Sequence, residues 1–155
     1  MNNILFLDCD GVLNHEAWYK SDNYYNNKFI DPDIDPAIVE RLNNLTSGTN
    51  TQIVISSSWK VDDYCIMRLE KAGVKNIVDI TPTFIFIAGD SYCRGMEIQA
   101  WLENNICNNY VIVDDIYDFY ENQRNHTLIV DYQLGLTDDD CMVLKNMLTA
   151  NVFDN

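Results

Sequence analysis

Short, uninterrupted apolar runs alternate along this chain with longer stretches in which apolar residues recur every three or four positions. The clearest runs cover residues 4–7, 52–55, 110–113 and 127–130. Runs of this length without alternating polar positions are typical of parallel strands that are buried on both faces. A further short strand is expected within 74–80, and the apolar residues 84–87 fit either a strand or a loop.

The stretches between these runs carry the periodicity and the end signals of helices. Pro36 suits the first position of a helix with Asp35 as its N-cap, and Gly48 is expected to end that helix. Further helices are predicted over residues 62–72, 95–104 and 137–148. Because strands alternate with helices, the sequence predicts an α/β fold, a three-layer Rossmann-like domain with a mainly parallel sheet.

Residues 14–35 interrupt this pattern. They mix aromatic side chains with Asn, Asp and Lys and have no clean period; the aromatic residues are Trp18, Tyr19, Tyr24, Tyr25 and Phe29. We interpret the segment as an ordered excursion over the edge of the sheet. With 155 residues in the chain, we expect a single domain over 1–155, an aromatic-rich insertion at about 14–35 and no large cap domain.

The composition narrows the class of protein. An apolar content of 47% is typical of a globular chain, and 10 basic against 24 acidic residues give a formal charge of −14. That charge disfavours an extended surface for nucleic-acid phosphates, although a single local anion site needs only a cation or two and a bound metal.

The cysteines and the N-terminal residues bear on location. The 5 cysteines have neither zinc-site spacing nor C-x-x-C pairing, which favours reduced thiols and a cytoplasmic protein. The first apolar run is too short for a signal peptide or a membrane span, and no basic region precedes it. We therefore expect no association with a membrane.

Charged and hydroxyl side chains follow the predicted strands at the end where parallel sheets bind ligands. After the first strand, Gly11 lets the chain turn away from the sheet. The candidate site residues are Asp8, Asp10, Ser56, Arg94, Asp114 and Asp115. These groups come from four separate segments, and the fold is expected to bring them to one edge.

Two of these assignments have rivals nearby in the sequence. Ser57 and Ser58 compete with Ser56, which is favoured because it directly follows the apolar run. Lys60 competes with Arg94 for the cationic role.

Aspartates without a histidine cluster suit Mg²⁺, a hard cation that prefers oxygen ligands. A carboxylate is also a competent nucleophile toward phosphorus, once a metal ion screens its charge from that of the phosphate. Residues 111–115 look like a Walker B strand, but no G-x-x-x-x-G-K-[ST] loop accompanies them. The pattern therefore favours phosphoryl transfer through carboxylates over nucleotide binding by a P-loop.

The order of the motifs resembles the haloacid dehalogenase-like (HAD) phosphohydrolase superfamily over most of the chain. The segments are D-C-D-G-V-L-N from residue 8, S-S-S-W from residue 56, R-G-x-E-I-x-x-W-L from residue 94 and G-L-T from residue 135. In these details the chain is similar to the HAD domains found alone or within RNA-repair ("Swiss Army Knife") proteins.

The resemblance implies a role for each acidic residue. Asp8 would be the nucleophile that forms an aspartyl-phosphate, and Asp10 the acid to the leaving oxygen and then the base to the attacking water. The carboxylates of Asp8 and Asp114 and the backbone carbonyl of Asp10 would bind Mg²⁺. Asp115 would bind the metal through water or orient its ligands. From its position alone, one helical turn beyond Asp115, Asp118 is a further candidate for the metal site, but we expect it to be a solvated helix residue.

The resemblance also implies the phosphate ligands and the activity. Ser56 would donate a hydrogen bond to a phosphoryl oxygen, and Arg94 would supply positive charge to the phosphate and to Asp8. The expected function is a Mg²⁺-dependent phosphomonoesterase acting on a terminal phosphate of a nucleotide or short oligonucleotide. A phosphatase of small non-nucleotide metabolites and a catalytically silent HAD-fold binding module stay open as alternatives.

Overall fold

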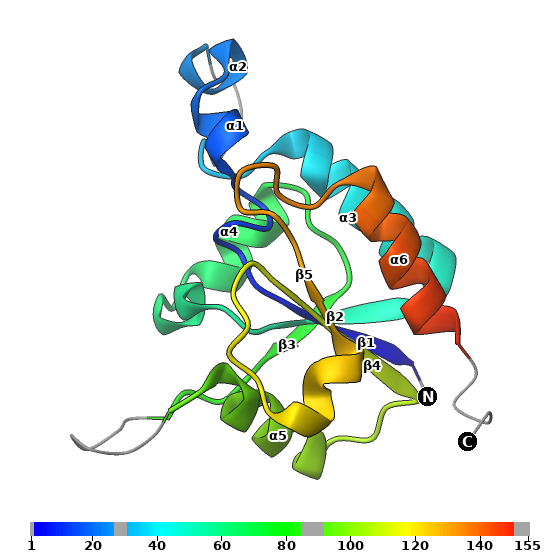
Figure 1. The fold of residues 1–155 in the computed structure, drawn as a ribbon. Coiled ribbons are helices and arrows are strands. Elements are labelled where there is room, and N and C mark those ends of the chain that lie inside the picture. Colours follow the sequence, from blue (N-terminus) through cyan, green and yellow to red (C-terminus); the bar gives the residue numbers. More distant parts are fainter. Residues whose placement is uncertain (1, 27–30, 85–91, 151–155) are drawn as a thin grey trace.

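The computed structural model describes residues 2–26, 31–84 and 92–150, and a parallel sheet forms its centre (Figure 1). The strands are β1 (Asn3–Leu7), β2 (Thr51–Ile55), β3 (Ile77–Ile80), β4 (Asn109–Asp114) and β5 (Thr127–Ile129). Their order across the sheet is β3-β2-β1-β4-β5, and neighbouring strands are parallel. The strand predicted first in the chain is therefore the central one.

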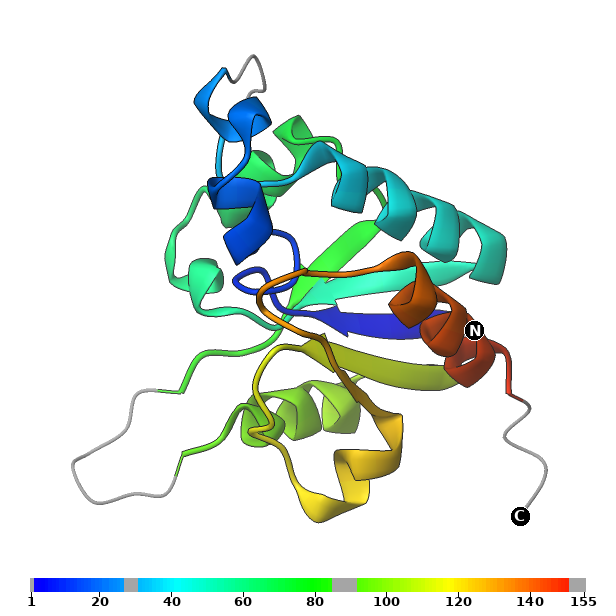
Figure 2. The ribbon, with the colours of Figure 1, turned by 45° about the horizontal axis from the view of Figure 1, so that its top comes forward.

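Helices cover both faces of the sheet (Figure 2). One face packs against α3 (Pro36–Thr49), α4 (Cys65–Lys71) and α6 (Asp138–Thr149), the other against α5 (Arg94–Asn104), with the 3₁₀ helix η2 (Glu121–His126) beside it. Along β1, Leu5 and Leu7 enter the first core, whereas Phe6 packs edge to face on Trp101 of α5 at 5.3 Å. This arrangement confirms the predicted three-layer α/β Rossmann-like fold. Among the described residues, no helix has the length and apolar character needed to cross a membrane.

Two helix boundaries differ from the sequence prediction. The helix predicted over 62–72 begins only at Cys65, as α4, because residues 62–64 form a turn in which Asp62 accepts hydrogen bonds from the amides of Tyr64 and Cys65; the 3₁₀ helix η1 (Ser58–Val61) precedes this turn. Helix α3 continues through Gly48 and ends at Thr49, and the C-cap residue Asn50 has a left-handed φ of 49°. Of the apolar residues 84–87, residues 85–87 lie outside the described part of the chain.

The described part of the insertion forms two short helices, α1 (Glu16–Tyr19) and α2 (Asp22–Tyr25), which project away from the sheet (Figure 1). Trp18 is 5% exposed, and its indole N–H donates to the Pro32 carbonyl at 2.9 Å. The Tyr24 ring meets those of Trp18 and Tyr19 edge to face, with centroids 6.3 Å and 5.2 Å apart. These aromatic residues therefore pack the insertion together; Phe29 lies outside the described residues.

Candidate active site

Two buried aspartates meet where the sheet reverses its winding. From β1 the chain adds β2 and β3 toward one edge and then returns to add β4 and β5 on the other side of β1; open α/β sheets bind ligands at such a switch point. β1 and β4 pair in register through Leu7 and Val113, and the Asp8 amide donates to the Val113 carbonyl at 3.1 Å. Asp8 is 5% exposed and Asp114 3%. Strand pairing thus places both carboxylates side by side at the carboxyl edge.

Asp115 completes a carboxylate cluster with these two residues. One oxygen from each of Asp8, Asp114 and Asp115 lies within 4.8 Å of the others. The cluster lines a cavity of about 370 Å³, which Asp10 and Ser58 also line. Hard oxygen donors at this spacing fit a small divalent cation such as Mg²⁺.

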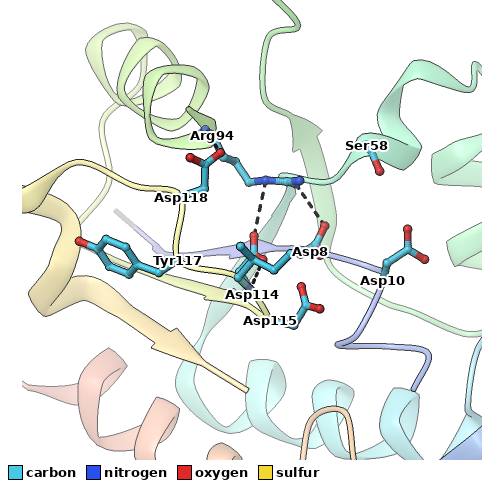
Figure 3. Close-up of a pocket in the computed structure, with 9 residues that line it drawn as sticks. Asp8, Asp10, Ser58, Arg94, Asp114, Asp115, Tyr117 and Asp118 are labelled. Atoms are coloured by element: carbon cyan, nitrogen blue, oxygen red, sulfur yellow. Dashed lines mark hydrogen bonds and ion pairs between the residues drawn. The ribbon is translucent and has the colours of Figure 1, made fainter. Parts of the chain in front are cut away.

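Arg94, the first residue of α5, reaches across to the cluster (Figure 3). Its Nη1 donates to Asp8 Oδ1 at 3.1 Å and to the Ser56 carbonyl, and its Nε lies 3.5 Å from Asp114 Oδ2. A single guanidinium thus faces several carboxylates. The cluster keeps a net negative charge when all of them are ionised, and a metal ion can neutralise that charge.

Burial raises the pKa of both strand-end aspartates. Burial raises the pKa of Asp8 to about 6, although the Arg94 charge and a hydrogen bond from the Ser57 hydroxyl act in the opposite direction. The pKa of Asp114 rises to about 7, first because the group is buried and second because the Asp8 carboxylate repels its charge. In the absence of a cation, these two carboxyls therefore hold their protons to a higher pH than an ordinary aspartate does.

We expect the metal-free protein to lose stability as the pH rises through these values. Both folded-state pKa values, about 6 and about 7, lie above the ordinary value of 3.8. At pH values between 3.8 and these folded-state values, the folded state therefore binds more protons than the unfolded state. The resulting stabilisation is present below the ordinary pKa and is lost as the pH rises through the folded-state values. Mg²⁺ should reverse the loss near neutral pH, because it binds the folded, ionised cluster.

Thermal melts in EDTA and in Mg²⁺, recorded from acidic to neutral pH, measure this effect. Asp114→Asn should flatten the pH dependence in EDTA and weaken the response to Mg²⁺. Asp139→Asn, the same change at an exposed position of α6, is the matched control and should preserve both. Identical curves for the two variants would show that the cluster is not the origin of the pH dependence.

At Gly11 the turn that follows Asp8 and Asp10 comes into contact with Asp115. Its φ is 71°, and a Cβ at this position would lie 2.4 Å from Asp115 Oδ2 and 2.8 Å from Asp115 Cβ. A glycine is required both by the left-handed backbone and by this close approach. The glycine of the D-x-D-G motif therefore lets the turn pack directly against Asp115.

The three consecutive serines have different surroundings. Ser56 Oγ is buried and has no hydrogen-bond partner among the described residues. The Ser57 hydroxyl hydrogen-bonds Asp8 and accepts from the Trp59 amide at 3.3 Å. Ser58 is exposed and lines the cavity, which Ser56 does not. The Ser57 hydroxyl already hydrogen-bonds Asp8, whereas the hydroxyl of the neighbouring buried Ser56 is available to donate a hydrogen bond.

Lys60 and Arg94 occupy different environments. The side chain of Lys60 is 4% exposed, forms an ion pair with Glu97, and donates to Thr81 Oγ1 at 2.8 Å and to the Pro82 carbonyl at 3.0 Å. Burial lowers its pKa. Arg94 lines the cavity, so the geometry favours Arg94 for contact with an anion.

Asp10 lies on the turn after β1, and its hydrogen-bond partners could not be predicted from the sequence. Its Oδ1 accepts from Asn14 Nδ2 at 2.8 Å, and its Oδ2 accepts from the Trp59 indole N–H at 3.0 Å. Trp59 was part of the S-S-S-W segment, but no sequence signal connects it to a residue 49 positions away.

The prediction that Asp118 is a solvated helix residue is wrong. The residues after β4 form bends and no helix, and Asp118 lines the cavity. Its Oδ2 accepts from the Arg94 amide at 2.9 Å, and its carbonyl accepts from the Gly95 amide at 3.0 Å. A carboxylate at this place satisfies the free amides of the helix start and complements the helix dipole. Asp118 therefore fixes the end of α5 that carries Arg94.

Residues 4–141 match the family described as HAD domain in Swiss Army Knife RNA repair proteins. The matched segment spans most of the 155 residues and includes every candidate site residue. No curated protein and no solved structure matches the chain.

Proposed function

This chain belongs to the family of HAD domains in Swiss Army Knife RNA repair proteins, and on that premise we propose that it is a Mg²⁺-dependent phosphomonoesterase acting through an aspartyl-phosphate. The family supports a HAD-type hydrolase in general. The finer proposal rests on the cluster of Asp8, Asp114 and Asp115, whose oxygens lie within 4.8 Å of one another beside Arg94. Phosphoryl transfer depends mainly on positioning and on neutralising charge, and this cluster offers both.

The proposed reaction has two steps on the same carboxylate. Asp8 attacks phosphorus, a bond forms between its oxygen and phosphorus, the ester P–O bond breaks, and Asp10 gives its proton to the leaving oxygen. Water then attacks the phosphorus of the aspartyl-phosphate and gives a proton to Asp10. Inorganic phosphate leaves, and the Asp8 carboxylate is restored.

Two further groups hold the phosphate in this proposal. Arg94 donates to Asp8 at 3.1 Å and has further N–H groups for the phosphoryl oxygens. The unpartnered Ser56 hydroxyl is the second donor. Because a buried donor without a partner is costly, a phosphoryl oxygen that accepts from Ser56 would be stabilised by that contact.

The donor set of the cluster fits Mg²⁺. The carboxylates of Asp8 and Asp114 and the backbone carbonyl of Asp10 would hold the ion, and Asp115 would bind it directly or through water. When bound, the ion neutralises the negative charge that accumulates between the carboxylate and the phosphate.

We propose a terminal phosphate on a nucleotide or short oligonucleotide as the substrate. The RNA-repair description of the family supports a nucleic-acid end, while the formal charge of −14 disfavours long polyanions. Trp18 is buried inside the insertion, which leaves it unsuited to stack on a base. Tyr117 lines the cavity and is 42% exposed, and its ring extends away from the carboxylate cluster (Figure 3). We propose that a base projecting from the site stacks on this ring. Nucleotide substrates should then have a lower KM than phosphate esters without a base.

Turnover of para-nitrophenyl phosphate tests the enzymatic proposal. We expect release of nitrophenolate in Mg²⁺, none in EDTA, and none from Asp114→Ala in either condition. Asp139→Asn should keep the wild-type rate, because this residue is exposed on α6. A pure, folded protein that binds nucleotides in Mg²⁺ but hydrolyses neither them nor the aryl ester would overturn the proposal in favour of a binding module.

A further inference from the structure

We propose that Trp59 positions the Asp10 carboxylate for proton transfer. We propose further that Arg68, held by Asp31 and Asp33 of the insertion, keeps the Trp59 ring in place. The inference rests on the proposed function and deepens it. It assigns the orientation of the acid and base group to a residue outside the aspartate motifs.

The Asp10 carboxylate is held from two sides although its residue is exposed. An exposed aspartate on a turn ordinarily samples several rotamers. Here Oδ1 accepts from Asn14 at 2.8 Å and Oδ2 accepts from Trp59 at 3.0 Å. Asn14 is itself oriented, because its Oδ1 accepts the Gly11 amide at 2.9 Å. The two donors together define one orientation of the carboxylate.

The Trp59 indole is fixed in turn by a cation on its face. The Arg68 guanidinium lies 4.3 Å from the centre of the Trp59 ring. Arg68 Nε donates to Asp31 Oδ2 at 2.9 Å, and Arg68 Nη2 lies 3.6 Å from Asp33 Oδ2. Asp31 is 7% exposed, so the ion pair is anchored in a largely buried carboxylate. A continuous set of contacts therefore runs from the insertion through α4 and η1 to Asp10.

This arrangement matters because proton transfer is sensitive to the position of the acid. The acid has to lie within hydrogen-bond reach of the leaving oxygen, and small displacements reduce the rate strongly. Trp59 acts through Asp10 in this account and is a positioning residue. In this account the insertion helps to orient Asp10 through Arg68 and Trp59, and this role does not require contact between its aromatic residues and the substrate.

Trp59→Phe is the main test, because it keeps an aromatic ring and removes the N–H donor. We expect the single-turnover rate of leaving-group release to fall about tenfold for a nucleoside monophosphate, whose leaving oxygen needs a proton. The rate for para-nitrophenyl phosphate should fall less than about twofold, because nitrophenolate departs without protonation. In an Asp10→Asn background, Trp59→Phe should change neither rate further, since the group that it positions is gone.

Arg68→Gln provides a second variant at a partly exposed position. It removes the cation from the Trp59 face. The ratio of the nucleoside monophosphate rate to the para-nitrophenyl phosphate rate should fall, as in Trp59→Phe, but by a smaller factor. If Trp59→Phe fails to fold, the Arg68→Gln ratio carries the test alone.

The chain offers a matched control in Trp101. Its indole N–H donates to Asp79 Oδ2 at 2.7 Å, which is the same kind of contact, made from α5 outside the candidate site. Trp101→Phe should leave the ratio between the two substrates unchanged.

Equal losses on both substrates in Trp59→Phe, or a ratio equal to that of Trp101→Phe, would overturn the inference and leave Trp59 a packing residue. The proposed function is judged separately, by wild-type turnover and its loss in Asp8→Asn. An unchanged ratio in an enzyme that passes that check refutes the positioning role alone.

Discussion

Asp8→Asn should abolish phosphatase turnover while the protein stays folded. The amide is nearly isosteric with the carboxylate but a poor nucleophile, and losses on removing a catalytic nucleophile reach about 10⁴-fold or more. The fold should tolerate the change, because Arg94 keeps its ion pair with Asp114 at 3.5 Å. In EDTA near neutral pH the variant should melt at a higher temperature than the wild type, because a buried charge beside Asp114 is removed.

The matched control is Asp131→Asn, the same substitution after the edge strand β5. Asp131 follows β5, and its Oδ1 accepts from the Gln133 amide at 2.9 Å, a bond that an asparagine also makes. This variant should keep wild-type activity. Wild-type turnover in Asp8→Asn would remove the nucleophile from the proposed mechanism.

Asp10→Asn should produce the second-largest effect, and its size should depend on the leaving group. General acid catalysis contributes about 10²- to 10⁴-fold, so the first step should slow by that order for a nucleoside monophosphate. The first step with para-nitrophenyl phosphate should slow far less, because nitrophenolate needs no proton. Rapid-quench measurement of leaving-group release separates this step from hydrolysis of the aspartyl-phosphate.

The second step provides an internal check on the same residue. If Asp10 is also the base for water, dephosphorylation should slow for every substrate in Asp10→Asn, because the intermediate is the same. An initial burst of nitrophenolate followed by slow turnover is therefore expected. Equal slowing of the first step across leaving groups would contradict acid catalysis by Asp10.

The position of Asp8 and Asp114 at the same edge of the sheet could be predicted from the sequence for a simple reason. Each aspartate directly follows an apolar run, and parallel strands place their carboxyl ends at one edge. Knowing that the runs are neighbours was unnecessary, since any parallel arrangement brings these residues to the same side. The apolar runs thus predict that both aspartates lie at the carboxyl edge of the sheet, and the observed strand order shows that β1 and β4 are the neighbours.

Contacts outside the strands were not predictable in the same way. The N–H of Trp59 reaches Asp10 from the 3₁₀ helix η1, an element that the sequence pattern did not predict between β2 and the helix expected from residue 62. Asp118 caps α5 because the residues after β4 bend and do not form a helix. In both cases a loop conformation decides the partner, and the apolar pattern carries no information on loop conformation.

Trapping the phosphorylated enzyme tests the central claim most directly. Asp10→Asn, mixed with para-nitrophenyl phosphate and Mg²⁺ and quenched in acid during the burst, should gain the mass of one phosphoryl group. Peptide mapping should place that group on Asp8, and the double variant with Asp8→Asn should gain nothing. A burst of nitrophenolate without any mass increase, or with the phosphoryl group on another residue, would contradict the account.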